Sequence, residues 1–132
     1  MPFVIDASTV LSWAFVDEKD PIADAAAERA VRDRPLAPAL WWFELRNGLI
    51  VNERRQRITA PATHAFLGRV RRIGIVLDRE PDEAAVLHLA RLHRLTVYDA
   101  IYLELALRRQ VGLVTLDTAL AKAARTAGVS QV

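Results

Sequence analysis

The stretch Phe3-Val4-Ile5-Asp6-Ala7-Ser8-Thr9 decides how the rest of the chain is interpreted. Three apolar residues that favour β-strands lead directly into an aspartate, and hydroxyl residues that can cap a helix follow at once. If residues 3–5 form a buried strand, Asp6 lies at the carboxyl end of that strand. A functional site at this edge would need further groups from distant parts of the chain.

Strand-like and helix-like segments alternate after this stretch. We expect strands at residues 34–38, 73–77 and 111–115, and a last edge strand that begins at Val129. The expected helices span residues 8–16 (capped by Ser8), 22–32, 40–51, 59–72, 81–94, 98–109 and 118–127. This order predicts an α/β fold, a three-layer α/β/α sandwich with a mostly parallel central sheet. In such sheets, ligands bind beyond the carboxyl ends of the strands.

Length and composition favour one domain over residues 1–132, and 52% hydrophobic residues suffice for a core. The longest stretch without acidic or basic side chains, residues 58–68, is too short and too polar for a membrane span. Asp6 comes too early for a signal peptide. The absence of cysteine excludes disulfides and thiolate metal sites. We therefore expect a cytoplasmic protein.

The basic residues are unevenly distributed although the net charge is only +2. Residues 53–72 contain six arginines and one acid, and 16 of the 18 basic residues are arginine. The planar arginine side chain suits phosphate. Two interpretations stay open at this point, a solvated helix face or a surface that attracts a polyanion such as RNA.

The most apolar segment, residues 40–51, is expected to form a buried helix. Glu44 and Asn47 are three positions apart and share a face of it. A carboxylate there needs an arginine, water or a cation as a partner, because burial of an unpaired charge is costly. We expect Trp42 and Phe43, more than Trp41, to belong to the core.

Four acids from separate segments are expected at one edge of the fold. Asp6 and Asp117 follow strand-like runs, Asp99 lies at the start of a helix, and Glu44 lies in the first turns of the apolar helix. Four neighbouring carboxylates repel each other, and a hard divalent cation such as Mg²⁺ or Mn²⁺ would relieve that repulsion. The alternative for each of the three aspartates is helix capping alone.

Four motifs in order resemble those of the PIN-domain ribonucleases, and within them the VapC-type toxins of bacterial toxin–antitoxin pairs. The resemblance covers nearly the whole chain and rests on Val4-Ile5-Asp6-Ala7-Ser8, Trp42-Phe43-Glu44-Leu45-Arg46-Asn47-Gly48-Leu49, Tyr98-Asp99-Ala100-Ile101-Tyr102-Leu103-Glu104-Leu105-Ala106 and Val114-Thr115-Leu116-Asp117. The departures from the family pattern are minor: Arg46 stands where a small or apolar residue is more usual, and Gly48 loosens its helix.

The resemblance implies a PIN-like fold and a Mg²⁺- or Mn²⁺-dependent endoribonuclease that acts as a toxin. The implied metal-binding and catalytic acids are Asp6, Glu44, Asp99 and Asp117. Ser8, Asn47 and Thr115 match polar positions of the family pattern. Ser8 and Thr115 would orient those acids, and Asn47 would hold Glu44 or contact substrate. Candidate RNA-binding residues are Arg46, Arg54, Arg55, Arg57 and Arg108.

The resemblance also implies a homodimer held inactive by a cognate antitoxin, for which the Trp41-Trp42 region and residues 58–70 are candidate contact surfaces. Two other functions compete with this hypothesis. A phosphoacceptor domain also places an aspartate after its first strand, but it needs further partners, and Ser8 stands where such a domain often has a second aspartate. A catalytically silent PIN-like module would only bind RNA or protein.

Overall fold

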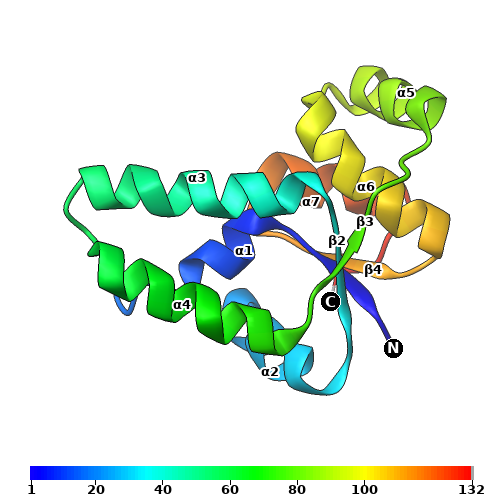
Figure 1. Cartoon of the computed structure of the whole chain (residues 1–132). Coiled ribbons are helices and arrows are strands. Elements are labelled where there is room, and N and C mark those ends of the chain that lie inside the picture. The colour runs from blue at the N-terminus through cyan, green and yellow to red at the C-terminus, as the bar shows by residue number, and fades with distance from the viewer. Residues whose placement is uncertain (132) are drawn as a thin grey trace.

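The computed structural model describes residues 1–131, which fold around a four-stranded sheet (Figure 1). The strands are β1 (Phe3–Ile5), β2 (Pro35–Pro38), β3 (Val76–Asp78) and β4 (Gly112–Val114). Their order across the sheet is β3-β2-β1-β4, and every neighbouring pair is parallel. The structure confirms the expected α/β/α sandwich with a parallel central sheet.

Seven helices connect these strands in the described part of the chain. They are α1 (Ala7–Ser12), α2 (Pro21–Arg32), α3 (Leu40–Arg54), α4 (Ala60–Ile73), α5 (Glu83–His93), α6 (Val97–Arg109) and α7 (Thr118–Thr126). Figure 1 shows α3 and α4 running from a shared turn beside the sheet, and α5 and α6 as a second pair. None of these helices is both long and apolar enough to cross a membrane.

The strand order reverses at β1. The chain moves from β1 to β2 and β3 on one side, and then returns to add β4 on the other side. The register pairs Ile5 with Val114, so that β1 and β4 end side by side. Such a switch point opens a crevice at the carboxyl edge of a parallel sheet, where ligands commonly bind.

The core side of α3 is set by helical spacing. Trp41, Leu45 and Leu49 recur every four residues and are buried, whereas Trp42 and Phe43 are 43% and 63% exposed. Our expectation that Trp42 and Phe43, rather than Trp41, belong to the core was wrong. Residues 40–43 are all apolar, so their local pattern alone did not identify which of them face the core.

Helix α1 packs closely against α3 at Gly48. A Cβ atom built at Gly48 would lie 2.6 Å from Cδ2 of Leu11, which is closer than atoms approach without repulsion. Glycine therefore lets the backbone of α3 approach α1. This contact lies one helical turn from Glu44.

Several expected boundaries differ from the structure. Helix α1 ends at Ser12 rather than residue 16, and α4 continues to Ile73, which delays β3 until Val76. The expected last strand is reduced to one isolated parallel bridge between Leu113 and Gln131. Residue 132 lies outside the described residues.

Candidate active site

Asp6 is buried at the end of β1 and receives hydrogen bonds from three neighbouring residues. Its Oδ1 accepts from the backbone N–H of Thr9 at 3.0 Å and from Thr9 Oγ1 at 2.7 Å. Ser8 Oγ lies 2.9 Å from both carboxylate oxygens, and Thr115 Oγ1 donates to Oδ2. Asp6, not Ser8, is therefore the cap of α1, because its extended backbone points the carboxylate at the N–H three residues on.

Burial raises the pKa of the Asp6 carboxyl above its ordinary value, and the hydrogen bonds from Thr115, Thr9 and Ser8 only partly oppose this effect. No basic side chain in residues 1–131 forms an ion pair with Asp6. The hydroxyl donors fix the orientation of the carboxylate but do not neutralise its charge.

Glu44 reaches the same region from α3. Its Oε1 accepts a hydrogen bond of 2.7 Å from the hydroxyl of Tyr102 on α6. Partial burial raises the pKa of Glu44, the Tyr102 hydrogen bond lowers it, and the negative charges of Asp6 and Asp99 raise it further. Glu44 thus lies close enough to both aspartates to feel their charge.

Asp99 is not a helix cap. Thr96 caps α6 by accepting the backbone N–H of Asp99 at 3.1 Å, and Asp99 lies within the first turn. Its carboxylate accepts no hydrogen bond within residues 1–131. Burial raises the pKa of Asp99, as do the charges of Asp117 and Asp6. The capping alternative therefore fails for this residue, although an acid in the first turn of a helix is favoured by the helix dipole.

Asp117 caps α7 by accepting the N–H of Leu120 at 2.9 Å. Its own N–H donates to Thr115 Oγ1 at 3.0 Å, and the same hydroxyl donates to Asp6. Thr115 therefore links the ends of β1 and β4. Capping occupies one carboxylate oxygen of Asp117 and leaves the other available.

The four acids form a group that lacks a counter-charge. None of them is ion-paired with a basic side chain among residues 1–131. The negative charges of neighbouring acids help to raise the pKa of Glu44 and that of Asp99. In their present positions, no three acidic or histidine side chains of that range are arranged to hold a metal ion. Like charges favour such separation. The donor chemistry nevertheless fits a hard divalent cation, which would supply the missing positive charge.

Tyr102 is a residue that the sequence interpretation did not assign to the site. It follows Asp99 by three positions, so both lie on one face of α6, and this spacing was the available signal. Its hydroxyl holds Glu44, while burial and the charge of Glu44 raise the pKa of Tyr102 far above its ordinary value. Tyr102 therefore remains a neutral hydrogen-bond donor.

The remaining residue predicted to orient an acid, Asn47, is exposed on α3, and its side chain makes no hydrogen bond in the described structure. It therefore does not hold Glu44 in this arrangement. Its role stays a prediction.

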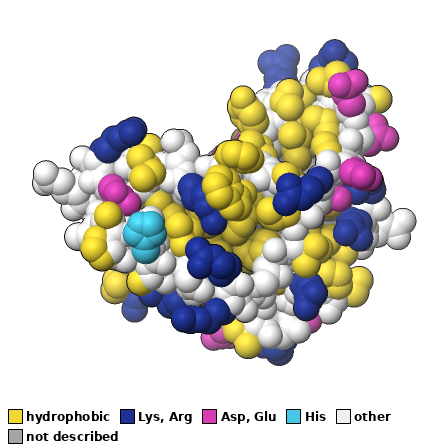
Figure 2. Space-filling model, in the orientation of Figure 1, with side chains coloured by type: hydrophobic (Ala, Val, Ile, Leu, Met, Phe, Trp, Pro, Cys, Tyr) yellow, Lys and Arg dark blue, Asp and Glu magenta, His cyan; other side chains and the backbone are white. Residues whose placement is uncertain are grey.

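Three of the five candidate RNA-binding arginines carry no ion pair within residues 1–131. Arg54 and Arg55 are exposed at the end of α3. Arg46 lies over the Trp42 ring at 3.9 Å, and burial and the nearby charge of Arg71 lower its pKa. Figure 2 shows dark blue basic side chains beside the hydrophobic area in the centre of one face, with acidic groups toward the edges.

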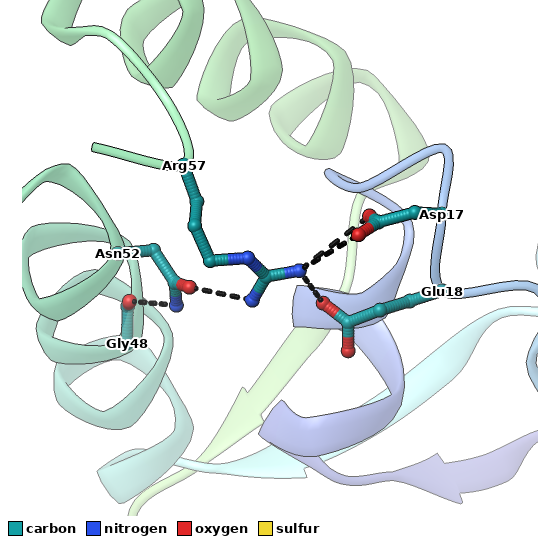
Figure 3. Close-up of polar contacts among 5 residues, drawn as sticks. All are labelled: Asp17, Glu18, Gly48, Asn52 and Arg57. Carbon is teal, nitrogen blue, oxygen red and sulfur yellow. Dashed lines mark hydrogen bonds and ion pairs between the residues drawn. The ribbon is translucent and has the colours of Figure 1, made fainter. Parts of the chain in front are cut away.

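The other two arginines are engaged with acids. Arg57 Nη2 lies 2.9 Å from Glu18 and 3.5 Å from Asp17, and Nη1 donates to Asn52 (Figure 3). Arg108 bridges Asp78 and Glu104 at 2.7 Å from each. RNA contact by Arg57 or Arg108 remains a prediction, and it would compete with these ion pairs.

A cavity of about 550 Å³ lies away from the four acids, near the amino ends of β1 and β4. Its lining includes Met1, Arg29 and Gln110 but no acid of the proposed site. Its size alone does not indicate function, so we place the site by the chemistry of the switch point instead.

Two comparisons with known proteins agree with the fold. The PIN-domain family model matches residues 3–126. The crystal structure of PAE2754 from Pyrobaculum aerophilum is similar in fold, with a TM-score of 0.74, 24% sequence identity, and coverage of 93% of this chain and 84% of that one. No curated protein sequence matches the chain.

Proposed function

We propose that this chain, which belongs to the PIN-domain family, is a divalent-metal-dependent endoribonuclease and the toxin of a toxin–antitoxin pair. PIN domains are generally nucleases, which supports the broader activity. The observation that carries the proposal is the group of four carboxylates without a counter-charge at the switch point. A protein that used these residues for folding alone would be expected to pair them with arginine, as it does elsewhere with Asp78 and Glu104.

Asp6, Asp99 and Asp117 would hold Mg²⁺ or Mn²⁺, with Glu44 as a direct or water-mediated ligand. When bound, such an ion lowers the pKa of water and stabilises negative charge that develops on a phosphate. Thr115 and Ser8 keep the Asp6 carboxylate in one orientation, and Tyr102 does the same for Glu44. These hydroxyl donors reduce the reorganisation needed when a cation and a phosphate arrive.

RNA would reach the acids along the arginine-rich surface. Arg46, Arg54 and Arg55 are the members of the predicted set without an acid partner in residues 1–131, so they can bind phosphate without breaking an ion pair. Cation binding at the acids would also weaken their repulsion of the RNA backbone. Substrate binding and metal binding should therefore be coupled.

The toxin assignment adds an antitoxin and a homodimer as partners. Trp42, Phe43 and Tyr98 are large side chains that are 43%, 63% and 59% exposed, and the last two directly precede Glu44 and Asp99. An antitoxin segment that covered them would shield apolar surface and block the acids together. Expression of the chain with and without the gene product that neutralises it would test this part: growth arrest and RNA fragments should occur only without that product.

The nuclease proposal is tested with purified protein and a panel of structured and single-stranded RNAs. We expect cleavage with Mg²⁺ or Mn²⁺ and none after chelation with EDTA. Cleavage that continues in EDTA would contradict the metal site. Binding of RNA without cleavage in any divalent ion would support the catalytically silent module instead.

A further inference from the structure

A second polar group without partners lies on the other side of α3 from Glu44. A cavity of about 290 Å³ that is open to solvent lies between α3, α4 and the start of β3, and its lining includes Trp41, Trp42, Arg46, Leu67, Val70 and Arg71. Glu44 and Arg46 are two positions apart on the helix, so they point in nearly opposite directions. The cavity is therefore distinct from the carboxylate site, and its volume is at the small end of the range for ligand pockets.

Trp41 supplies a hydrogen-bond donor that nothing in the described structure accepts. The residue is 5% exposed, and its Nε1 has no hydrogen-bond partner within residues 1–131. An unsatisfied buried donor costs about 1–3 kcal/mol. Trp13 provides a contrast, because its Nε1 donates to the carbonyl of Ala23 at 2.9 Å. Trp41 also lines the cavity, so an occupant that carried an acceptor would offer this indole a partner.

Two arginines add positive charge to the same cavity. Neither Arg46 nor Arg71 has an acidic side chain within ion-pair distance in residues 1–131. Arg46 is held flat against the Trp42 ring at 3.9 Å and donates to the Trp42 carbonyl at 3.1 Å. Its position is therefore defined without an anion. The cavity thus combines an apolar lining with three donor groups and no acidic side chain.

This combination suits a nucleotide. Phosphate satisfies two guanidinium groups, and a base covers apolar surface while its ring atoms accept hydrogen bonds. Stacking on aromatic side chains adds affinity for unpaired bases. The arginine excess in residues 53–72 favours RNA over an acidic protein segment, because a polyanion benefits from the surrounding charge as well as from the cavity.

We propose that this cavity is a subsite for one unpaired nucleotide of the RNA substrate, with its phosphate between Arg46 and Arg71 and its base beside Trp41 and Trp42. The inference rests on the proposed ribonuclease function and deepens it. The nucleotide lies across α3 from the carboxylates, so the RNA passes over this helix. The subsite selects RNA that is unpaired at this position, since a base in a duplex cannot enter the cavity.

The direct test uses the indole N–H signals of Trp13, Trp41 and Trp42 in ¹⁵N-labelled full-length protein. Trp41→Phe identifies the Trp41 signal. Titration with adenosine or uridine monophosphate in EDTA should shift this signal with saturation, and should leave Trp13 unchanged because its donor is already bonded. Arg46→Gln and Arg71→Gln should each weaken the response at least fivefold. Arg91→Gln, which removes one exposed arginine on α5, is the matched control.

A second measurement addresses RNA itself without cleavage. The Asp99→Asn variant in EDTA is titrated with a fluorescent single-stranded RNA at several salt concentrations. Removal of Arg46 or Arg71 should weaken binding about five- to tenfold and reduce the salt slope by about 0.7, as expected for the loss of one phosphate contact. Trp42→Leu should weaken binding about fivefold with little change in slope.

Several results would overturn the subsite. One is an unchanged Trp41 signal in the presence of nucleotide, and another is equal RNA affinity of the Arg46, Arg71 and Arg91 variants. A Trp41 shift with poly-glutamate but not with nucleotide would assign the cavity to an acidic protein segment. These results are independent of catalysis: cleavage without the shift removes the subsite alone, whereas the shift without metal-dependent cleavage removes the nuclease proposal.

Discussion

Two groups of acids in this protein are built in opposite ways. Asp78 and Glu104 share the guanidinium of Arg108, at 2.7 Å from each, and this contact lowers the pKa of Asp78. The group of Asp6, Glu44, Asp99 and Asp117 has hydroxyl and amide donors but no basic partner within residues 1–131. The first group needs nothing more for stability. In the second group, the carboxylates repel one another, and a bound cation can relieve this repulsion.

The largest expected effect of this difference is on activity. Asp99→Asn removes a proposed metal ligand and should reduce Mg²⁺-dependent RNA cleavage more than about 100-fold, since even residues that only orient ligands contribute 10–100-fold. The fold should survive, because Thr96 caps α6. Initial cleavage rates measure the activity, and circular dichroism measures whether the fold is retained. Asp78→Asn is the matched control, and equal loss in the two variants would contradict the comparison.

Arg108→Met tests the ion-paired group. Glu104 is 3% exposed and would lose the one basic partner that it has in residues 1–131. Because Arg108 is partly exposed, the free energy of unfolding should fall by about 3 kcal/mol, the lower end of the range for a buried pair. Urea titration measures this change. Cleavage per folded molecule is measured as well, because Arg108 is also a predicted RNA contact. A loss of cleavage in a fully folded variant would mean that Arg108 also contacts RNA, as the sequence interpretation allowed.

Metal should stabilise the protein through the second group alone. At a Mn²⁺ concentration ten times its dissociation constant, the free energy of unfolding should rise by about 1.4 kcal/mol. Thermal melting at increasing Mn²⁺ measures this, with Ca²⁺ as a comparison ion. The effect should vanish in Asp99→Asn and persist in Asp78→Asn. Equal stabilisation of all three proteins would indicate binding elsewhere.

The same substitution should have opposite effects on stability in the two groups. Without metal at neutral pH, Asp99→Asn relieves repulsion from Asp6 and Asp117 and should stabilise the fold by about 0.5 kcal/mol. Asp78→Asn weakens an ion pair and should destabilise it by a similar amount. Paired urea titrations in EDTA decide this. Destabilisation by Asp99→Asn would show that Asp99 has a structural role after all.

The smallest expected effect is the pH dependence of the metal-free protein. The raised pKa values of Asp6, Glu44 and Asp99 mean that the folded state takes up protons before the unfolded chain does, so stability should increase as pH falls from neutral. Asp78 has the opposite effect, because its pKa is lowered in the folded protein. Its contribution to stability is present above its ordinary pKa of 3.8 and is lost as the pH falls through its lower pKa in the folded state. Melting curves from pH 8 to pH 3 in EDTA should show a smaller increase for Asp99→Asn.

Local sequence patterns predicted most of the helices and strands, and they indicated that the four acids lie at one edge of the fold. Short β-branched runs and well-capped helices reveal strands and helices without reference to the rest of the chain, and carboxylates placed after strands mark an edge of a parallel sheet. The structure places Asp6 and Asp117 at the ends of adjacent strands. Whether the four acids bind metal stays a prediction.

Long-range pairing could not be predicted from the sequence. In the sequence, Arg57 and Arg108 have no evident distant acidic partner. In the structure they pair with Glu18 and Asp78, which are 39 and 30 positions away. The same limit hid the hydrogen bond from Tyr102 to Glu44 across 58 positions. Within α3, residues 40–43 are all apolar, so the sequence did not indicate which tryptophan faces the core. These errors share one cause, because each depends on how separate segments pack against one another in the folded chain.

The close approach of α1 and α3 at Gly48 has an evolutionary consequence. Because a Cβ at this position would meet Leu11, the sizes of the side chains at positions 11 and 48 are linked. Relatives with alanine at the position of Gly48 should have a smaller side chain at the position of Leu11, and the two positions should covary. Substitutions at this pair would also move Glu44, which lies one helical turn away. Changes at two uncharged positions could therefore alter or abolish the activity of the site.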